Sequence, residues 1–436
     1  MKARSLAKKL MISFYTKVFQ KEPGPLTRSF MKNLMYIFVG FIIAKALSVV
    51  FQIYTGRIIG PAEYGKFAYI NSLAQILYTP MMFGIGTALV KYLSEKTDED
   101  ERRRIVSSGI ALMLLFTLAF AGAFYVLAAP ISYSASIAQN YVYAAIILAV
   151  LYSVWTASQK LLQGLMGMRE ISILNIIWSV VVLVTVVLYT GAERTVYAPL
   201  LAVSLGYIIS SIVALPSLVR YFRPRIDAAC TRKLLKFGFI AVWASLSVSM
   251  TTGINQIFIN MFMDMSDVGI YQAYHFSSVD VMSFFLTGFI TVFFAESSRY
   301  KNKGVLFSQL RKSMKLMPMV FAAMLLISYS ILLLYGRDYP ISPLLICLFA
   351  LASVAAFLQG VYTWFSTSHG MKGVKITTTT VMLVSIVNIA LSYALIQYLS
   401  IAGAALSLIF SYSMGAMIMY IRIKKVSCGP AGEDGG

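Results

Sequence analysis

Apolar residues fill long, regularly spaced stretches of this chain, and short polar stretches separate them. A helix that crosses a bilayer needs about 20 predominantly apolar residues, and twelve stretches meet this requirement. None of them shows the strict alternation of apolar and polar residues that is typical of a strand. We therefore predict an all-α integral membrane protein with twelve transmembrane helices. The predicted spans are 34–55, 67–90, 105–128, 140–162, 171–190, 196–219, 237–262, 268–295, 316–336, 343–366, 376–397 and 400–421.

The composition indicates a protein with little mass outside the membrane. Its mean hydropathy is +0.76, and only 12% of its 436 residues are charged, about half the share of a soluble protein. The net charge of +20 could indicate nucleic-acid binding. The basic residues lie between apolar stretches, however, so topology explains them and we expect no nucleic-acid partner. The three cysteines show no metal-binding spacing, and we expect membrane lipids as partners, no metal and no cofactor.

The basic residues also orient the chain, because cytoplasmic loops of membrane proteins are enriched in Lys and Arg. With a cytoplasmic N-terminus, 32 of the 37 Lys and Arg residues fall in cytoplasmic segments and four fall outside. The remaining one, Lys45, lies inside a span. The chain is therefore predicted to be a multi-pass protein of the cell membrane with both termini in the cytoplasm.

The second half of the chain repeats the first at an offset of 204 residues. Residues 59–65 align with 263–269, and without a gap Gly84 aligns with Gly288. Because six spans separate the copies, both halves have the same orientation, which predicts two six-helix lobes related by a pseudo-twofold axis along the membrane normal. The predicted units are a basic cytoplasmic segment (1–33), an N-lobe (34–222), a cytoplasmic linker (223–236), a C-lobe (237–425) and a disordered tail (426–436).

Lys45 lies near the middle of the first span, where a charged side chain costs roughly 2.5–3.5 kcal/mol on insertion scales. Ser48 and Gln52 follow it at i+3 and i+7 and share its helix face. We predict that this face and its repeat line a substrate cavity between the lobes, with Lys45 attracting an anionic group. The alternative is that Lys45 pairs with an intramembrane acid and only supports packing. The counterparts of this face at the offset of 204 are Ser249, Thr252 and Gln256.

The acid that could pair with Lys45 is Asp280, near the middle of the eighth span. An intramembrane Asp or His is also a candidate for coupling transport to H⁺ or Na⁺, and both interpretations of Asp280 stay open. His275 lies five residues earlier, about 140° around an α-helix, so it need not share a cavity with Asp280.

Four charged residues lie at the ends of predicted spans and are candidate gate charges. Arg57 and Lys66 lie at the predicted outer mouth, where they could ease the release of an anionic headgroup or simply be solvated in a turn. Lys91 and Glu296 lie at the cytoplasmic ends of corresponding spans in the two lobes. These last two could be gates or ordinary interfacial residues.

Four stretches resemble a known family. They are RIIGPAEYGKFAYINSL (57–73), GIGTALVKYLSE (84–95), LLQGLMGMREISILN (161–175) and IAGAALSLIFS (401–411). They are similar to polysaccharide-transport proteins, the O-antigen and exopolysaccharide flippases of the multidrug/oligosaccharidyl-lipid/polysaccharide exporter superfamily. The resemblance covers nearly the whole chain. It implies a two-lobed transporter that moves an oligosaccharide linked to a polyprenyl diphosphate from the cytoplasmic to the outer leaflet for cell-surface polysaccharide assembly.

Two other functions are weighed against this one. A membrane enzyme of polysaccharide assembly is expected to carry a sizeable external loop with catalytic charges, whereas every predicted outside loop is short, so we expect no catalytic residues. An ion-coupled multidrug efflux antiporter of the same superfamily is the stronger rival. Such a pump favours an acid in the first lobe, where this chain has Lys45. We therefore favour an anionic, lipid-linked cargo moved by alternating access in a monomer.

Overall fold

The computed structural model describes residues 25–95, 98–134, 137–191, 193–223, 226–287, 290, 314–367 and 370–428. Within these ranges every element is helical, as predicted. In chain order the elements are α2 (Pro25–Met82), α3 (Ile85–Glu95), α4 (Glu99–Val126), α5 (Ala128–Ser134), α6 (Gln139–Gly164), α7 (Met168–Thr190), α8 (Tyr197–Val219), α9 (Ala228–Phe262), α10 (Met265–His275), the π-helix η1 (Phe276–Asp280), the 3₁₀-helix η2 (Met314–Leu316), α13 (Met317–Tyr335), α14 (Pro343–Thr367) and α15 (Gly370–Cys428).

Nine helices in the described ranges are long and apolar enough to cross a membrane. Two of them, α2 and α15, contain a non-helical residue, Gly60 and Ser400 respectively. Gly60 lies between the first and second predicted spans, and Ser400 is the first residue of the twelfth. Helical structure therefore covers most of each predicted span within the described residues, and the second span is interrupted at Phe83 and Gly84, between α2 and α3. The total of twelve crossings stays a prediction, because the eighth span continues into residues outside the described ranges.

The turn in α2 depends on glycine. Gly60 has φ +79° and ψ 168°, a backbone conformation that is essentially restricted to glycine. Pro61 follows it, and proline is favoured at the first position of a helix because it has no N–H to leave unpaired. The sequence Gly-Pro therefore ends one helix and begins the next. We call residues 25–59 the first arm of α2 and residues 61–82 its second arm.

The second half of the chain turns at the equivalent place. Asp264, which the repeat aligns with Gly60, lies between α9 and α10, and its side chain accepts hydrogen bonds from the backbone of Ser266 and Asp267 at 2.8 and 3.1 Å. This is the usual role of an N-cap aspartate. The same turn thus depends on the conformational freedom of Gly60 in the first half and on helix capping by Asp264 in the second.

The two halves cross closely at a pair of glycines beside these turns. A Cβ on Gly65 would lie 1.7 Å from the carbonyl oxygen of Met265, and a Cβ on Gly269 would lie 2.0 Å from that of Pro61. The offset of 204 residues exchanges these two contacts. A pseudo-twofold axis between the two glycines produces this exchange, so the sequence repeat is also a repeat in space.

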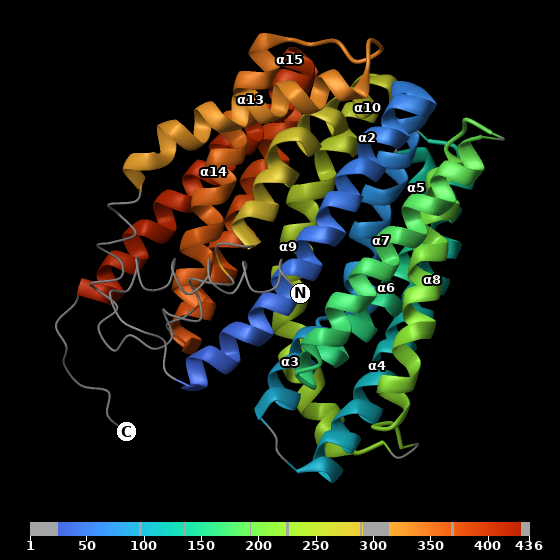
Figure 1. Cartoon of the computed structure of the whole chain (residues 1–436), viewed down its shortest axis with the longest axis vertical. Coiled ribbons are helices and arrows are strands. Elements are labelled where there is room, and N and C mark those ends of the chain that lie inside the picture. The colour runs from blue at the N-terminus through green and yellow to red at the C-terminus, as the bar shows by residue number, and fades with distance from the viewer. Residues whose placement is uncertain are drawn as a thin grey trace.

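Helices of each half pack on one another, except that α10 of the second half packs mainly against α2 of the first (Figure 1). The second arm of α2 and α3 also pack against α9, which joins the halves.

The predicted linker is largely helical, since α9 already begins at Ala228 and its N-cap Asp227 accepts hydrogen bonds from Ala229 and Cys230. The hydrogen bonds that these two backbone amides donate to the Asp227 carboxylate lower its pKa. The domain boundaries stay predictions, and residues 1–24 and 429–436 of the predicted terminal segments lie outside the described residues.

Candidate functional site

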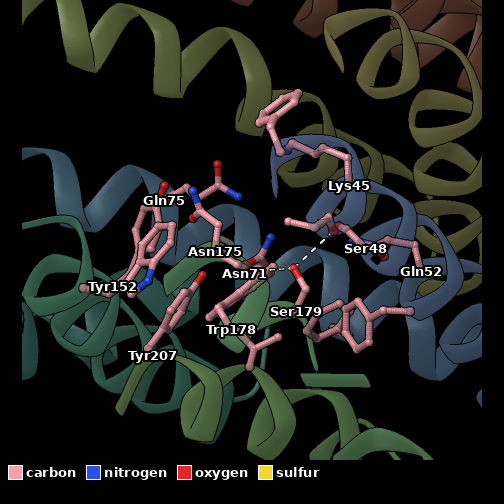
Figure 2. A pocket seen from close by; sticks show the side chains of 16 residues that line it. Lys45, Ser48, Gln52, Asn71, Gln75, Tyr152, Asn175, Trp178, Ser179 and Tyr207 are labelled. Atoms are coloured by element: carbon pink, nitrogen blue, oxygen red, sulfur yellow. Dashed lines mark hydrogen bonds between the residues drawn. The ribbon is translucent and has the colours of Figure 1, made fainter. Parts of the chain in front are cut away.

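The first cavity lies among α2, α6, α7 and α8 and has a volume of about 360 Å³ (Figure 2). The predicted polar face of the first span lines it, with Lys45, Ser48 and Gln52 all at its wall. Of the residues that line this cavity, only Lys45 is charged. The cavity therefore combines one positive charge with neutral polar groups, a composition that suits an anionic or neutral polar ligand better than a cation.

Lys45 reaches from the first half of the chain toward the second. Its Nζ lies 4.3 Å from the ring centre of Phe284, in the helical turn that follows η1, and 5.4 Å from that of Phe41. Aromatic faces attract cations by about 0.5–2 kcal/mol, so these rings partly replace a counter-ion. Among the described residues Lys45 and Asp280 form no ion pair, although their charges attract at longer range.

A hydrogen-bond chain links this cavity to the end of the molecule that carries the Gly60 turn. The hydroxyl of Tyr64 donates to Gln52 Oε1 at 2.8 Å and lies 3.1 Å from the hydroxyl of Tyr335 in α13. The hydroxyl of Tyr339 donates to the carbonyl of Gly56 at 2.9 Å. Because α13 belongs to the second half of the chain, the halves are joined here by buried hydrogen bonds.

A second cavity of about 420 Å³ lies in the other half of the chain, and Asp280 and His275 line it. Their side chains are in contact, with His275 Nδ1 3.4 Å from Asp280 Oδ2. On an α-helix His275 and Asp280 would lie about 140° apart, as predicted from the sequence. The π-helix η1 brings them together, because its hydrogen bonds run from residue i+5 to residue i and place residues five apart on nearly the same face. The closing bond runs from the amide of Val281 to the carbonyl of Phe276.

The predicted repeat of the polar face divides between two environments. Thr252 lines the second cavity, whereas Ser249 is buried and its hydroxyl lies 2.7 Å from that of Thr79 in α2. Gln256 is also buried, with its amide 3.0 Å from that of Gln272. The expectation that all three line a cavity is corrected for Ser249 and Gln256, because α9 packs against the second arm of α2 and this contact covers them.

The candidate gate charges at the Gly60 end are engaged locally. Arg57 Nη1 donates to the carbonyl of Leu334 at 3.5 Å, between the two halves. Lys66 pairs with Glu63, which raises the pKa of Lys66. The other carboxylate oxygen of Glu63 accepts a hydrogen bond from the amide of Val196 at 2.8 Å, just before α8. The contacts of Lys66 and Glu63 favour a structural turn.

At the opposite end, Lys91 in α3 lies over an aromatic ring of the other half. Its Nζ is 4.8 Å from the ring centre of Phe237 in α9. This contact crosses between the halves, as a gate contact would. The corresponding candidate Glu296 lies outside the described residues.

Thirteen residues that line the first cavity were not predicted from the sequence, and seven of them form an aromatic group and an amide group. Four are aromatic, and their ring centroids lie 5.4–6.0 Å from their neighbours within the group. Three are amides on α2 and α7. Polar residues inside apolar spans were the signal for the amides, but aromatic residues are so common in this chain that no pattern singled out the four rings. The residues are Tyr152, Trp155, Trp178, Tyr207, Asn71, Gln75 and Asn175.

Comparison with solved structures identifies the fold. The chain has the fold of an inward-facing multidrug resistance MATE family transporter of the MOP superfamily (TM-score 0.67, 13% identity, 89% of this chain and 96% of that one). It also resembles a MOP superfamily transporter from Pyrococcus furiosus, described as having a binding pocket of reverse polarity (TM-score 0.60, 12% identity, 92% and 97% covered). A third is the lipid II flippase MurJ in an inward closed conformation (TM-score 0.57, 16% identity, 89% and 90% covered).

The chain belongs to the family of polysaccharide biosynthesis proteins, which residues 30–294 match. This confirms the resemblance noted in the sequence. A curated relative, an uncharacterized membrane protein of Methanocaldococcus jannaschii, is 26% identical over 207 residues, which span 46% of this chain and about half (48%) of the relative. Family and fold together make the chain a multi-pass membrane protein of a polysaccharide biosynthesis family, with the fold of MATE transporters and of the flippase MurJ.

Proposed function

We propose that the chain moves an oligosaccharide linked to a polyprenyl diphosphate from the cytoplasmic to the outer leaflet by alternating access. The observation that carries this proposal is the charge of the first cavity, where Lys45 is the one charged residue in the lining. A diphosphate presents several acceptor oxygens and negative charge, which a cation facing neutral donors binds well. Membership of a polysaccharide biosynthesis family supports a glycan as the rest of the cargo.

The proposed orientation follows from the basic residues, which place both termini in the cytoplasm. The Gly60 turn then lies on the outer side, where Gly65 packs against the backbone of α10 and Tyr64 contacts Tyr335. With the halves joined at that end, the cavity is closed to the outside.

The direct test is a flipping assay in proteoliposomes with a fluorescent, polyprenyl-diphosphate-linked disaccharide. We expect wild type to flip it, Lys45→Arg to retain a substantial rate, and Lys45→Ala to lose at least about tenfold, since a charge-assisted hydrogen bond contributes about 1.5–3 kcal/mol. Size-exclusion profiles and thermal unfolding of each variant show whether it is folded. A folded Lys45→Ala that flips at the wild-type rate would contradict the role of Lys45.

A second function is favoured by one observation, the acid in the second cavity. Asp280 and His275 could bind a proton or cation and drive an efflux antiporter rather than a flippase. Transport of ethidium in the same proteoliposomes distinguishes the two. Uptake of ethidium that depends on a pH gradient and is lost in Asp280→Asn, without flipping of the lipid-linked sugar, would replace the flippase proposal with a pump. Under the flippase proposal the same pair is the candidate coupling site for H⁺ or Na⁺.

A further inference from the structure

The wall of the first cavity opposite Lys45 has a chemistry of its own. In Figure 2 the side chains of Asn71, Gln75 and Asn175 lie between Lys45 on one side and the rings of Tyr152 and Tyr207 on the other. The rings come from α6 and α8, and the amides from α2 and α7. The cavity therefore changes from a charged end to an uncharged end built of amides and aromatic rings.

The three amides have hydrogen-bonding capacity to spare. Each carries two N–H donors and a carbonyl acceptor, and none of them makes a side-chain hydrogen bond to another described residue. All three side chains are half-buried and line the cavity, so their donors and acceptors are open to a ligand. A ligand with many hydroxyl groups, which can both donate and accept, matches such a wall.

The rings beside the amides form one continuous surface. Trp155 and Tyr207 have centroids 5.4 Å apart, and Trp178 and Tyr207 are stacked at 5.9 Å with planes 21° apart. Rings packed against each other on three helices are held in place before a ligand arrives. A sugar ring has an apolar C–H face and an edge of hydroxyl groups, so it matches an aromatic surface next to amides.

We propose that this end of the cavity is a sugar-binding subsite that takes one neutral sugar ring of the cargo, while Lys45 holds the adjoining diphosphate. This inference rests on the proposed function for the nature of the cargo. It adds that the glycan binds in the first half of the chain, to side chains of α2, α6, α7 and α8. A planar aromatic cation also fits against rings, but Lys45 in the same cavity repels it. The amides would moreover remain partly unpaired against a ligand without hydroxyl groups.

Tryptophan fluorescence tests the subsite without any lipid. The chain has four tryptophans, and replacing Trp243 and Trp364 by Phe leaves Trp155 and Trp178 as reporters of this cavity. The protein is purified in a detergent without a sugar headgroup and titrated with neutral hexoses, N-acetylhexosamines and their disaccharides. We expect a saturable change in fluorescence with at least one of these sugars and none with ethidium at the same sites.

Two substitutions on different helices then locate the binding. Asn175→Ala on α7 and Gln75→Ala on α2 should each weaken binding of the responding sugar about tenfold, because each removes a hydrogen-bonding group from the wall. Asn140→Ala is the matched control: this exposed amide at the start of α6 bonds only to the adjacent amide of Tyr141 and should leave binding unchanged. If one cavity variant does not fold, the other carries the test.

The outcomes separate this inference from the proposed function. No saturable response to any sugar, or a response that both cavity variants leave unchanged, would overturn the subsite. Sugar binding that the two variants weaken supports it, even if the proteoliposomes show no flipping, in which case only the proposed function fails. Flipping by a protein that binds none of the sugars would leave the function standing and remove the subsite.

Discussion

The two halves of the chain meet along two contacts that the repeat makes equivalent, yet the contacts differ in chemistry. In what we call the paired seam, the second arm of α2 and α3 pack against α9, and Thr79 and Ser249 share a hydrogen bond of 2.7 Å. In what we call the charged seam, the first arm of α2 faces η1 and residues 281–287. There the equivalents of Ser249 and Thr79 are Lys45 and Ser283.

Small residues account for the closeness of the paired seam. A Cβ on Gly253 would lie 3.3 Å from the carbonyl of Ser72, and a Cβ on Gly84 would lie 2.3 Å from that of Gly238. In the charged seam Val49 stands where Gly253 does. Small residues let membrane helices approach each other and stabilise their contact. The paired seam is thus a close, stable contact. The charged seam contains Lys45 and Asp280, the residues proposed for cargo binding and ion coupling.

The largest expected effect is at the glycine crossing shared by both halves. Gly65→Ala should lower the free energy of unfolding by at least about 3 kcal/mol, because its Cβ would lie 1.7 Å from a backbone oxygen that cannot move alone. Thermal unfolding and the yield of monodisperse protein measure this. Gly122→Ala is the control, since nothing lies within 4 Å of that position. Equal stability of the two variants would contradict the close crossing.

Ser249→Lys places the charge of one seam into the other. It should destabilise the protein by roughly 2.5–3.5 kcal/mol, the cost of a cation in mid-membrane, because Ser249 is buried against Thr79 and Pro80 stands at the position equivalent to Phe284. Thermal unfolding in detergent checks this. If Ser249→Lys is as stable as wild type, the paired seam is not as dry or as close as the structure indicates.

The reciprocal change, Lys45→Ser, should separate stability from function. Removing a cation from mid-span is expected to raise the free energy of unfolding by up to about 2 kcal/mol, while flipping falls at least about tenfold. Unfolding and flipping are measured on the same preparation. A variant that loses both stability and flipping would show that Lys45 serves packing instead.

The smallest effect tests the hydrogen bond of the paired seam. Thr79→Val should cost about 0.6–1.7 kcal/mol, the range found for such bonds between membrane helices. Ser283→Ala, at the equivalent place in the charged seam, should cost close to nothing, since that hydroxyl bonds only within its own helix, to the carbonyl of Asp280 at 2.6 Å. A thermal shift of the same size in both would remove the distinction between the seams.

The sequence was sufficient for the helical fold, for the register of the repeat and for the first polar face. Hydrophobic runs of membrane length need no tertiary information, and a charge such as Lys45 stands out because the membrane makes it expensive. The repeat also misled. It predicted that Ser249 and Gln256 line a cavity, although pseudo-equivalent faces need not meet equivalent surroundings. Which face of α9 is covered depends on its own glycines and on a partner helix far away in the chain.

Two other features lay beyond reach of the sequence for physical reasons. The contact between His275 and Asp280 requires a π-turn, whose hydrogen-bond pattern depends on packing rather than on any residue type in the pattern. The aromatic and amide wall is formed by residues from four helices. No spacing along the chain relates these residues, so the wall can be recognised only once the helices are packed.

The chain of hydroxyl groups at Tyr64 has one more consequence, which concerns the direction of its protons. A phenol has a single proton, and Tyr64 gives its own to Gln52 Oε1. Tyr64 can then only accept from Tyr335, so the hydrogen bonds run in one direction, toward the cavity. With its oxygen occupied, the amide of Gln52, which lines the first cavity, has its two N–H groups left to donate. The polarity of the first cavity is therefore set in part by Tyr64 and Tyr335, which are not among its lining residues.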